Sequence, residues 1–204
     1  MARWQGGARE RLREAALGLF GTQGYDGTTV AEIAAAAGVT ERTFFRYYAD
    51  KREVLFVDQT AFEQAFLAGL PPERDDAGLP PDDDDAGLPA DGDDPMRLIA
   101  AVLDSAAGLF PEERRPWSRA RQKVITANVA LQERELLKMS ALAVTLTGAL
   151  TARGADPTSA ALAAESGVTV FRTAFSVWVT PDEQRTFLEI QQAVLARLHT
   201  LIGQ

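Results

Sequence analysis

Residues 31–55 read AEIAAAAGVTERTFFRYYADKREVL, and this stretch decides how the N-terminal part of the chain is interpreted. Apolar residues recur at i, i+3, i+4 and i+7 from Val30 to Ala37, which predicts one buried face of a short helix. Gly38 follows where that helix must end, because glycine enters a left-handed conformation without steric cost. Thr40 can then cap a second short helix through its hydroxyl. The pattern therefore predicts two helices joined by a tight turn.

The second of these helices has two chemically different faces. Phe44 and Tyr48 share one face at i, i+4 spacing, so we expect them to pack inward. The other side carries charged and aromatic residues, namely Glu41, Arg42, Phe45 and Arg46. An exposed aromatic residue between two arginines is unusual for a plain solvated face, although Glu41 could serve only as a local cap or ion-pair partner. This is the layout of a helix-turn-helix whose second helix lies in a DNA major groove.

Three stretches of the chain together resemble the signature of the TetR (tetracycline repressor) family of bacterial transcriptional regulators. They are ALGLF at 16–20, GYDGTTV at 24–30, and residues 31–55, so the resemblance covers about residues 8–56. It implies an all-α fold of about nine helices. An N-terminal three-helix helix-turn-helix domain, residues 1–56, would be followed by a helical-bundle domain for effector binding and dimerisation, residues 57–204.

The resemblance also implies which side chains contact DNA. Thr28 and Thr29 would cap the second helix and offer hydroxyls to a phosphate, although Thr28 could also serve as a cap alone. Tyr47 matches a phosphate-contacting tyrosine, and Lys51 matches a lysine at the start of a fourth helix, where free N–H groups favour a phosphate. The chain departs from the family at Arg42, where Gly or Ala is common, and at Ala49, where Pro is common. The expected DNA-binding residues are Thr28, Thr29, Thr40, Glu41, Arg42, Thr43, Phe45, Arg46, Tyr47 and Lys51.

The net charge of −8 over 204 residues does not exclude DNA binding, because the negative charge is concentrated in one segment. Residues 71–95 hold nine aspartates and one glutamate against a single arginine, and the rest of the chain has a net charge of +1. The distribution of charge, not its sum, decides whether a surface attracts nucleic acid. The absence of cysteine excludes disulfides and cysteine-ligated zinc, and the chain shows no signal-peptide core or membrane-length apolar run. We therefore expect a cytoplasmic protein that does not contact membranes.

The acidic segment itself contains a tandem near-repeat, DDAGLPPDD at 75–83 and DDAGLPADG at 84–92. Proline, glycine and aspartate dominate it, so the sequence predicts a disordered or extended insert over residues 71–95. A calcium loop from Asp82 to Asp93 is an alternative. Ala86 provides no ligand at the fifth position of that loop, so we expect no metal site.

Capping signals place the remaining helices. The first of these helices runs from Asp94-Pro95 to about Leu109, and the second ends near Asn128. Two further helices are expected over residues 131–153 and 156–179. Thr180-x-x-Glu183 matches a capping box and predicts the start of the last helix, and a fourth helix is expected from Lys51 to about Leu70.

The last helix carries two apolar stripes, which predicts that it buries two faces. One face would pack on its own subunit and the other across a two-fold axis, as in the resembled family, although both could be covered within one subunit. The expected interface of this homodimer comprises Phe175, Trp178, Leu188, Leu195 and Ile202.

By the same resemblance, the middle helices would enclose a cavity for a small effector of hydrophobic or amphipathic character. Arg121 could pair with an anionic effector, or it could be a solvated or salt-bridged arginine. The candidate lining residues are Trp117, Arg121, Ile125, Asn128, Met139, Leu142, Leu146 and Phe171.

Catalysis is not indicated. His199 is the only histidine, it lies near the end of an amphipathic helix, and no reactive group accompanies it. We therefore expect no enzyme and no cofactor, but a regulator that binds a double-stranded operator. A repressor released by its effector is the favoured reading, and an activator or a low-specificity DNA-binding protein is the alternative.

Overall fold

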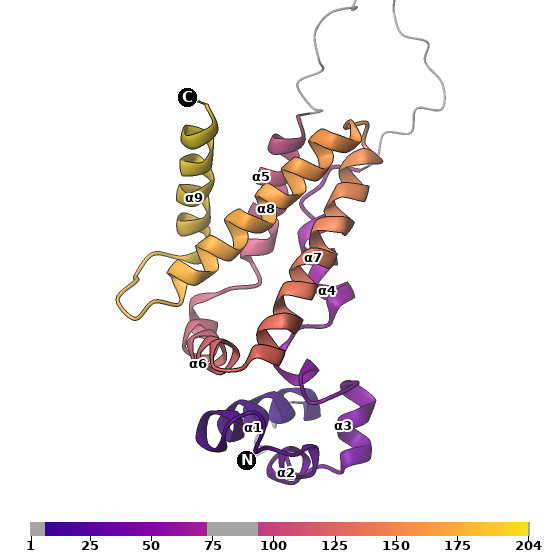
Figure 1. Ribbon diagram of the computed structural model, residues 1–204, viewed down its shortest axis with the longest axis vertical. Helices are drawn as coiled ribbons and strands as arrows, with labels where there is room; N and C mark the ends of the chain where they lie inside the picture. Colours follow the sequence, from indigo (N-terminus) through magenta and orange to yellow (C-terminus); the bar gives the residue numbers. More distant parts are fainter. Residues whose placement is uncertain (1–6, 73–93, 204) are drawn as a thin grey trace, which may run out of the picture. The chain divides into compact units, whose positions relative to one another are not determined.

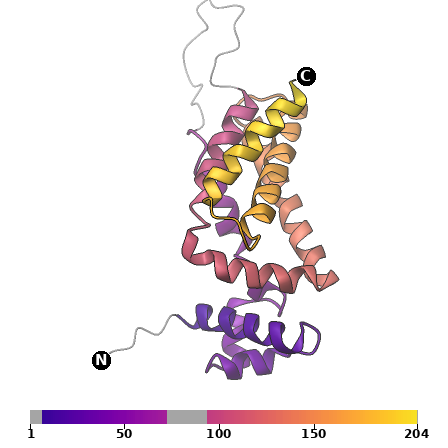
Figure 2. The same cartoon turned by 90° about the vertical axis from the view of Figure 1, so that its left-hand side faces the viewer.

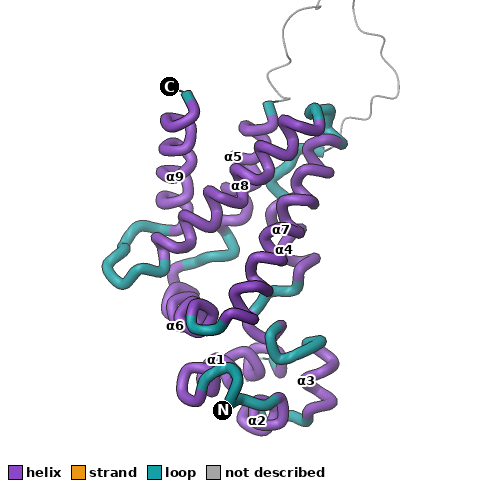
Figure 3. The backbone as a smooth tube through the Cα atoms, viewed as in Figure 1, coloured by secondary structure: helices purple, strands orange, loops and turns teal. Residues whose placement is uncertain are grey.

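The computed structural model describes residues 7–72 and 94–203 (Figure 1). These residues form helices and connecting loops, with no strand among them, which confirms the predicted all-α class (Figure 3). The α-helices of the described ranges are α1 (Ala8–Gln23), α2 (Val30–Ala36), α3 (Glu41–Tyr47), α4 (Gln59–Leu67), α5 (Pro95–Ala107), α6 (Arg115–Thr126), α7 (Val129–Thr151), α8 (Pro157–Trp178) and α9 (Phe187–Ile202). Two short 3-10 turns, η1 (Glu53–Leu55) and η2 (Glu112–Arg114), complete the described elements.

Packing divides the described residues into two compact units. The first contains the described residues up to Ala61 together with Arg114–Leu137, and the second contains those of 62–113 and 138–203. α4 and α7 each contribute residues to both units. The first unit therefore includes α6 and the beginning of α7 in addition to the expected DNA-binding segment 1–56. As a functional division, the boundary after residue 56 remains a prediction.

The first unit has its own apolar core, built on α1. Leu12, Ala16 and Phe20 recur every four residues on one face of α1 and are buried. The other members of the core come from α2, α3, the η1 region, α6 and α7: Ile33, Ala37, Phe44, Tyr48, Val54, Leu55, Phe56, Ile125 and Leu131.

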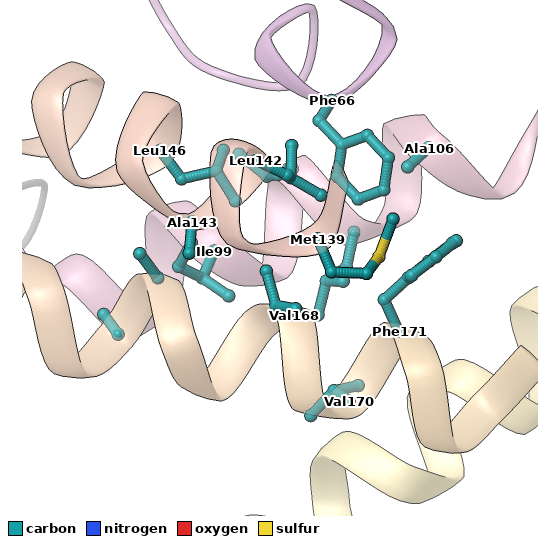
Figure 4. Packing of buried hydrophobic residues seen from close by; sticks show 14 of the residues in the cluster. Phe66, Ile99, Ala106, Met139, Leu142, Ala143, Leu146, Val168, Val170 and Phe171 are labelled. Carbon is teal, nitrogen blue, oxygen red and sulfur yellow. The ribbon is translucent and has the colours of Figure 1, made fainter. Parts of the chain in front are cut away.

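The second unit is organised around packed aromatic rings and small residues. Phe62 and Phe66 of α4 lie 5.9 and 5.2 Å, between ring centroids, from Phe171 of α8. In Figure 4, Phe66 and Phe171 lie around Met139 of α7. Gly167 lets α8 approach α5 closely, because a Cβ atom there would lie 2.8 Å from Cγ2 of Ile99. These contacts make a filled core, in which dispersion and hydrophobic burial act together.

α9 packs on α8 and α5 in this unit (Figure 2). Gln191 of α9 is buried and donates a hydrogen bond to the Leu103 carbonyl at 2.7 Å. Leu195 is half-buried against the same core, whereas Leu188 and Ile202 are 38% and 65% exposed. Leu195 was predicted to lie on the apolar stripe that faces a partner subunit. In the structure it packs instead on the core of its own subunit.

Trp178 was expected at the dimer interface, and the structure corrects this. Its side chain is fully buried, its ring lies 5.7 Å from Phe187 and 5.9 Å from Phe110, and its indole N–H donates to Glu112 at 3.3 Å. A residue enclosed in this way has no surface for a partner subunit. Phe175 is half-buried beside it and packs on Phe110.

The caps of α5 and α8 agree with their predicted starts. The Asp94 carboxylate accepts a hydrogen bond from the Met96 N–H at 2.9 Å. Asp156 accepts in the same way from the N–H groups of Thr158 and Ser159, and a proline occupies the first turn of both helices.

The predicted capping box at Thr180-x-x-Glu183 is wrong. Thr180 donates to the Val177 carbonyl, and Glu183 binds Arg185 and nearby backbone N–H groups, which lowers the pKa of Glu183 to about 2. The box is formed six residues later by Thr186 and Glu189, directly before α9.

The single fourth helix expected over 51–70 is also wrong. The chain forms η1 first, then leaves helical conformation at Phe56, whose φ and ψ are −107° and 150°. The helix α4 begins only at Gln59, where the Asp58 carboxylate accepts from the Ala61 N–H.

The acidic segment predicted to be disordered falls largely on residues 73–93, which lie outside the described residues, as does the alternative calcium loop. None of the described helices combines the length and apolar character needed to cross a membrane.

Candidate nucleic-acid interface

The turn between α2 and α3 fixes the geometry of the helix-turn-helix. Gly38 has φ of +66°, a conformation that strains any residue with a Cβ atom. The N–H groups of Gly38 and Val39 close the end of α2 by donating to the carbonyls of Ala35 and Ala34. The Thr40 hydroxyl then accepts from the Thr43 N–H at 3.2 Å and starts α3. The end of α2 and the start of α3 are therefore both capped by hydrogen bonds within this turn.

The two faces of α3 divide as the sequence predicts. Phe44 and Tyr48 are buried, with ring centroids 5.4 Å apart, and the Tyr48 hydroxyl donates to the Arg9 carbonyl. Burial of the phenol raises the pKa of Tyr48, so it stays neutral. The opposite face is open to solvent and carries Glu41, Arg42, Phe45, Arg46 and Tyr47, with Phe45 54% exposed.

Arg46 and Tyr47 form a preassembled pair on this open face. The Arg46 guanidinium donates to the Tyr47 hydroxyl at 3.2 Å and lies 4.9 Å from its ring centroid. Guanidinium groups suit phosphate and guanine edges, and a phenol can donate to a phosphate. The pair therefore presents two donors for nucleic acid from adjacent positions. Thr40 is exposed and Thr43 is half-buried at the start of the same helix, their hydroxyls 3.1 Å apart.

Thr28 does not fit the role expected for it. Its side chain is 1% exposed, and its hydroxyl donates to the Gly24 carbonyl at 2.8 Å. We correct the expectation that this hydroxyl is offered to a phosphate, because burial leaves it no surface to present. Its part is to close the loop between α1 and α2.

Thr29 is exposed and caps α2 in a complete capping box. Its hydroxyl accepts from the Glu32 N–H, and Glu32 in return accepts from the backbone N–H and hydroxyl of Thr29. These two hydrogen bonds, the backbone one first, lower the pKa of Glu32. The cap is thus the structural role of Thr29, and its contact with DNA remains a prediction.

Lys51 lies beneath the loop that leads into α2, not at the start of a fourth helix. Its ammonium donates to the carbonyls of Tyr25 and Thr28 at 2.7 and 2.8 Å and lies 4.2 Å from the Tyr25 ring centroid. Sequence reasoning assigned Lys51 only a phosphate contact. The structure adds that it holds the loop together.

The residues expected to line an effector cavity are not brought together in one unit. Trp117, Arg121, Ile125 and Asn128 belong to the first unit, whereas Met139, Leu142, Leu146 and Phe171 belong to the core of the second. Ile125 is fully buried in the first core, and the Arg13 guanidinium lies 4.4 Å from a Trp117 ring centroid. A single effector cavity lined by all eight residues remains a prediction.

Arg121 forms an ion pair with a carboxylate of the chain itself, which was the predicted alternative to contact with an anionic effector. Its guanidinium donates to the Leu55 carbonyl at 2.8 Å and to Glu135 at 3.1 Å, and it lies 4.8 Å from the Phe56 ring centroid. Burial lowers the pKa of Arg121, and the adjacent Glu135 carboxylate opposes that shift. Asn128 is likewise engaged, because its side chain donates to Asp26 and accepts from the Leu131 N–H.

Sequence reasoning also missed a long-range ion pair in this unit. Arg134 of α7 binds Glu53 of η1 at 2.5 Å, across 81 positions of the chain. Charges this far apart in sequence carry no local signal, so only the folded unit reveals the pair.

Comparison with known proteins agrees with this geometry. The family described as "Bacterial regulatory proteins, tetR family" matches residues 12–56. The HTH-type transcriptional regulator TcmR of Streptomyces glaucescens is 50% identical over 62 residues, which are 30% of this chain and 27% of that protein. The chain therefore aligns with only about a quarter of the length of this relative.

Two solved structures are similar along most of the chain. A putative fatty acid metabolism regulator of Clostridium perfringens has a TM-score of 0.52 at 18% identity, covering 95% of this chain and 98% of its own. The regulator FadR of Bacillus subtilis, solved with stearoyl-CoA, has a TM-score of 0.50 at 18% identity, covering 93% of this chain and 96% of its own. Such identities establish likeness of fold.

The capped helix pair and the open cationic and aromatic face of α3 place the protein in the class of helix-turn-helix DNA-binding proteins. Within that class, residues 12–56 match the tetR family of bacterial regulatory proteins.

Proposed function

We propose that the protein regulates transcription by binding a specific palindromic operator as a homodimer, and that a small effector releases it. The observation that carries this proposal is the open face of α3, where Arg42, Phe45, Arg46 and Tyr47 are all exposed. A cytoplasmic repressor is the form we favour.

The release mechanism would be a shift between two conformations of unequal operator affinity. The effector would bind within the second unit. α4 and α7 are the helices suited to transmit its effect, because each is continuous from one unit into the other. FadR of Bacillus subtilis was solved with stearoyl-CoA, so acyl-CoA thioesters form one class in a first effector panel, beside free metabolites.

The test begins with selection of DNA from a random pool by the full-length protein. Against the selected site, Arg46→Ala should weaken binding by about 1–3 kcal/mol, because an exposed arginine that reads a base contributes that much. Thermal unfolding should be unchanged. Arg97→Ala, an exposed arginine of α5, is the matched control and should bind normally.

A salt titration on selected and random DNA addresses the low-specificity alternative. A specific regulator keeps a large affinity difference between the two DNAs at physiological salt, whereas a non-specific binder loses affinity for both in parallel. Equal affinities throughout would contradict the proposal. A reporter gene behind the selected site then separates repression from activation by the sign of its response.

A further inference from the structure

The first unit contains a cavity of about 440 Å³ beside the end of α3, and nothing in the proposed function uses it. Its wall combines residues of α1, α3, the segment after η1, and α7, including Arg9, Tyr47, Tyr48, Val57 and Leu137. The volume lies within the range of small-molecule sites. We propose that this cavity binds a small amphipathic organic anion, with an apolar, flat body and one carboxylate or sulfonate group.

The apolar part of the argument rests on exposed side chains that converge on the cavity. Tyr47, Val57 and Leu137 are 38%, 37% and 62% exposed, although all three are large hydrophobic residues. They come from α3, the loop after η1 and α7, yet all line the same cavity. An apolar ligand body would cover surface that now faces water, which favours binding.

The sign of the ligand charge follows from the ionic groups in the wall. Arg52 is paired with Asp50 at 2.8 Å, and Arg134 is paired with Glu53. Asp58 is also charged, but its carboxylate accepts the Ala61 N–H and lies at the positive end of the α4 helix dipole, which offsets its negative charge.

Arg9 is the basic side chain of the wall that these two ion pairs leave over, and among the described residues no carboxylate forms an ion pair with it. Its guanidinium lies 5.9 Å from the Tyr48 ring centroid. A cation beside an aromatic surface suits a planar anion, which can meet the guanidinium while its body covers apolar side chains.

The position of the cavity gives binding a consequence. Tyr47 lines the cavity and also belongs to the open face of α3. A ligand that covers Tyr47 therefore competes with DNA for the same side chain. This competition rests on the proposed function, whereas binding of the anion does not.

The binding arm uses the full-length protein without DNA and two probes of one shape and opposite charge, 2-naphthoate and 2-naphthylmethylammonium, followed by their fluorescence. Naphthoate should bind more tightly. Arg9→Gln should weaken naphthoate by about tenfold, the effect of one charged hydrogen bond, and leave the cationic probe unchanged.

Leu137→Ser should weaken both probes by about fivefold, because it removes apolar wall. Leu136→Ser is the matched control, since Leu136 is the neighbouring residue, is 51% exposed and does not line the cavity. Thermal unfolding of each variant establishes that it is folded. Equal effects of the two serine variants, or an unchanged naphthoate affinity in Arg9→Gln, would overturn the site.

The DNA arm adds naphthoate to the protein bound to its selected site. Naphthoate should weaken DNA binding by the wild-type protein. Leu137→Ser should need about fivefold more naphthoate for the same loss of DNA binding, because it binds the apolar body of the ligand about fivefold more weakly. Naphthoate that binds without weakening the DNA complex would overturn the competition. A protein that binds naphthoate but no DNA would instead contradict the proposed function alone.

Discussion

Lys51 shows how one side chain can organise a loop that precedes a DNA-contacting helix. Its ammonium donates to both the Tyr25 and Thr28 carbonyls, and the Tyr25 carbonyl also accepts from the Thr28 N–H, so the lysine adds a charged donor to this turn. The Tyr25 ring lies under the same ammonium, and burial of that ring raises the pKa of Tyr25. A phosphate near Lys51 would therefore meet a cation that is already fixed in position.

We expect Lys51→Met to lower the free energy of unfolding by about 1–3 kcal/mol, because two carbonyls lose a charged donor. Binding to selected and random DNA should weaken together, since the lost charge does not read bases. Urea unfolding and DNA titration measure the two effects. Lys123→Met on the exposed side of α6 is the control and should change stability by less than about 0.5 kcal/mol. A variant of full stability would show that the loop closes without the lysine.

At the scale of single residues, the sequence predicted which side chains of α3 point inward. It did not predict which groups a side chain binds. The spacing of Phe44 and Tyr48 correctly predicted which face of α3 turns inward, because helical periodicity is local. The partners of Arg121 could not be predicted, since Leu55 lies 66 positions away. The burial of Thr28 was missed although the pattern Thr29-x-x-Glu32 marks Thr29 as the cap, because nothing in the sequence shows that the Thr28 hydroxyl turns to the Gly24 carbonyl.

The start of a helix depends on a side chain that caps its first N–H groups. The capping residue was predictable where the sequence offers a single candidate. Asp94 and Asp156 each precede a proline and cap as expected. Before α9 the chain offers two Thr-x-x-Glu patterns, at 180 and at 186. Arg185 captures Glu183 and leaves the second pattern to form the box. Which carboxylate is captured is a matter of geometry that the pattern does not contain.

The capping box of α2 gives a test at this scale. Thr29→Ala should lower the free energy of unfolding by about 1 kcal/mol, because the N–H of Glu32 loses its acceptor. Thr29→Ser keeps the hydroxyl and should retain most of the stability. Thermal unfolding distinguishes them, and an alanine variant as stable as the serine variant would mean that solvent replaces the cap.

At the scale of the whole molecule, the DNA-binding helices do not complete their own core. Ile125 of α6 and Leu131 of α7 are fully buried with Leu12 and Phe44 in the first unit. Capping signals predicted where the later helices lie in the sequence, but such signals do not say which core a helix face joins. The family model matches residues 12–56, so the match gives no information on where residues 114–137 pack.

We expect Leu131→Ala to cost about 2–5 kcal/mol of stability, since it leaves a cavity in a filled core. Leu136→Ala on the exposed side of the same helix should cost less than about 0.5 kcal/mol. Urea unfolding followed by tryptophan fluorescence, with DNA binding measured in parallel, checks both. A Leu131 variant that unfolds like the control would show that α7 is dispensable for the first core.

The proposed homodimer can be tested by contrasting two leucines of α9. Leu188 is exposed near the start of the helix, where an aspartate also suits the helix dipole, so Leu188→Asp should leave the protomer folded. If Leu188 faces a partner subunit, the two aspartates are buried unpaired in each dimer and association should be lost. Leu195 is half-buried on the core of its own subunit, so Leu195→Asp should instead lower the thermal midpoint of the protomer.

Sedimentation and thermal unfolding separate the two outcomes, and Val144→Asp on the exposed face of α7 is the control for added charge. Loss of the dimer should also weaken binding to a palindromic site, because a lone subunit engages one half-site only. A Leu188→Asp protein that remains dimeric with full operator affinity would place the two-fold axis on another face of the second unit.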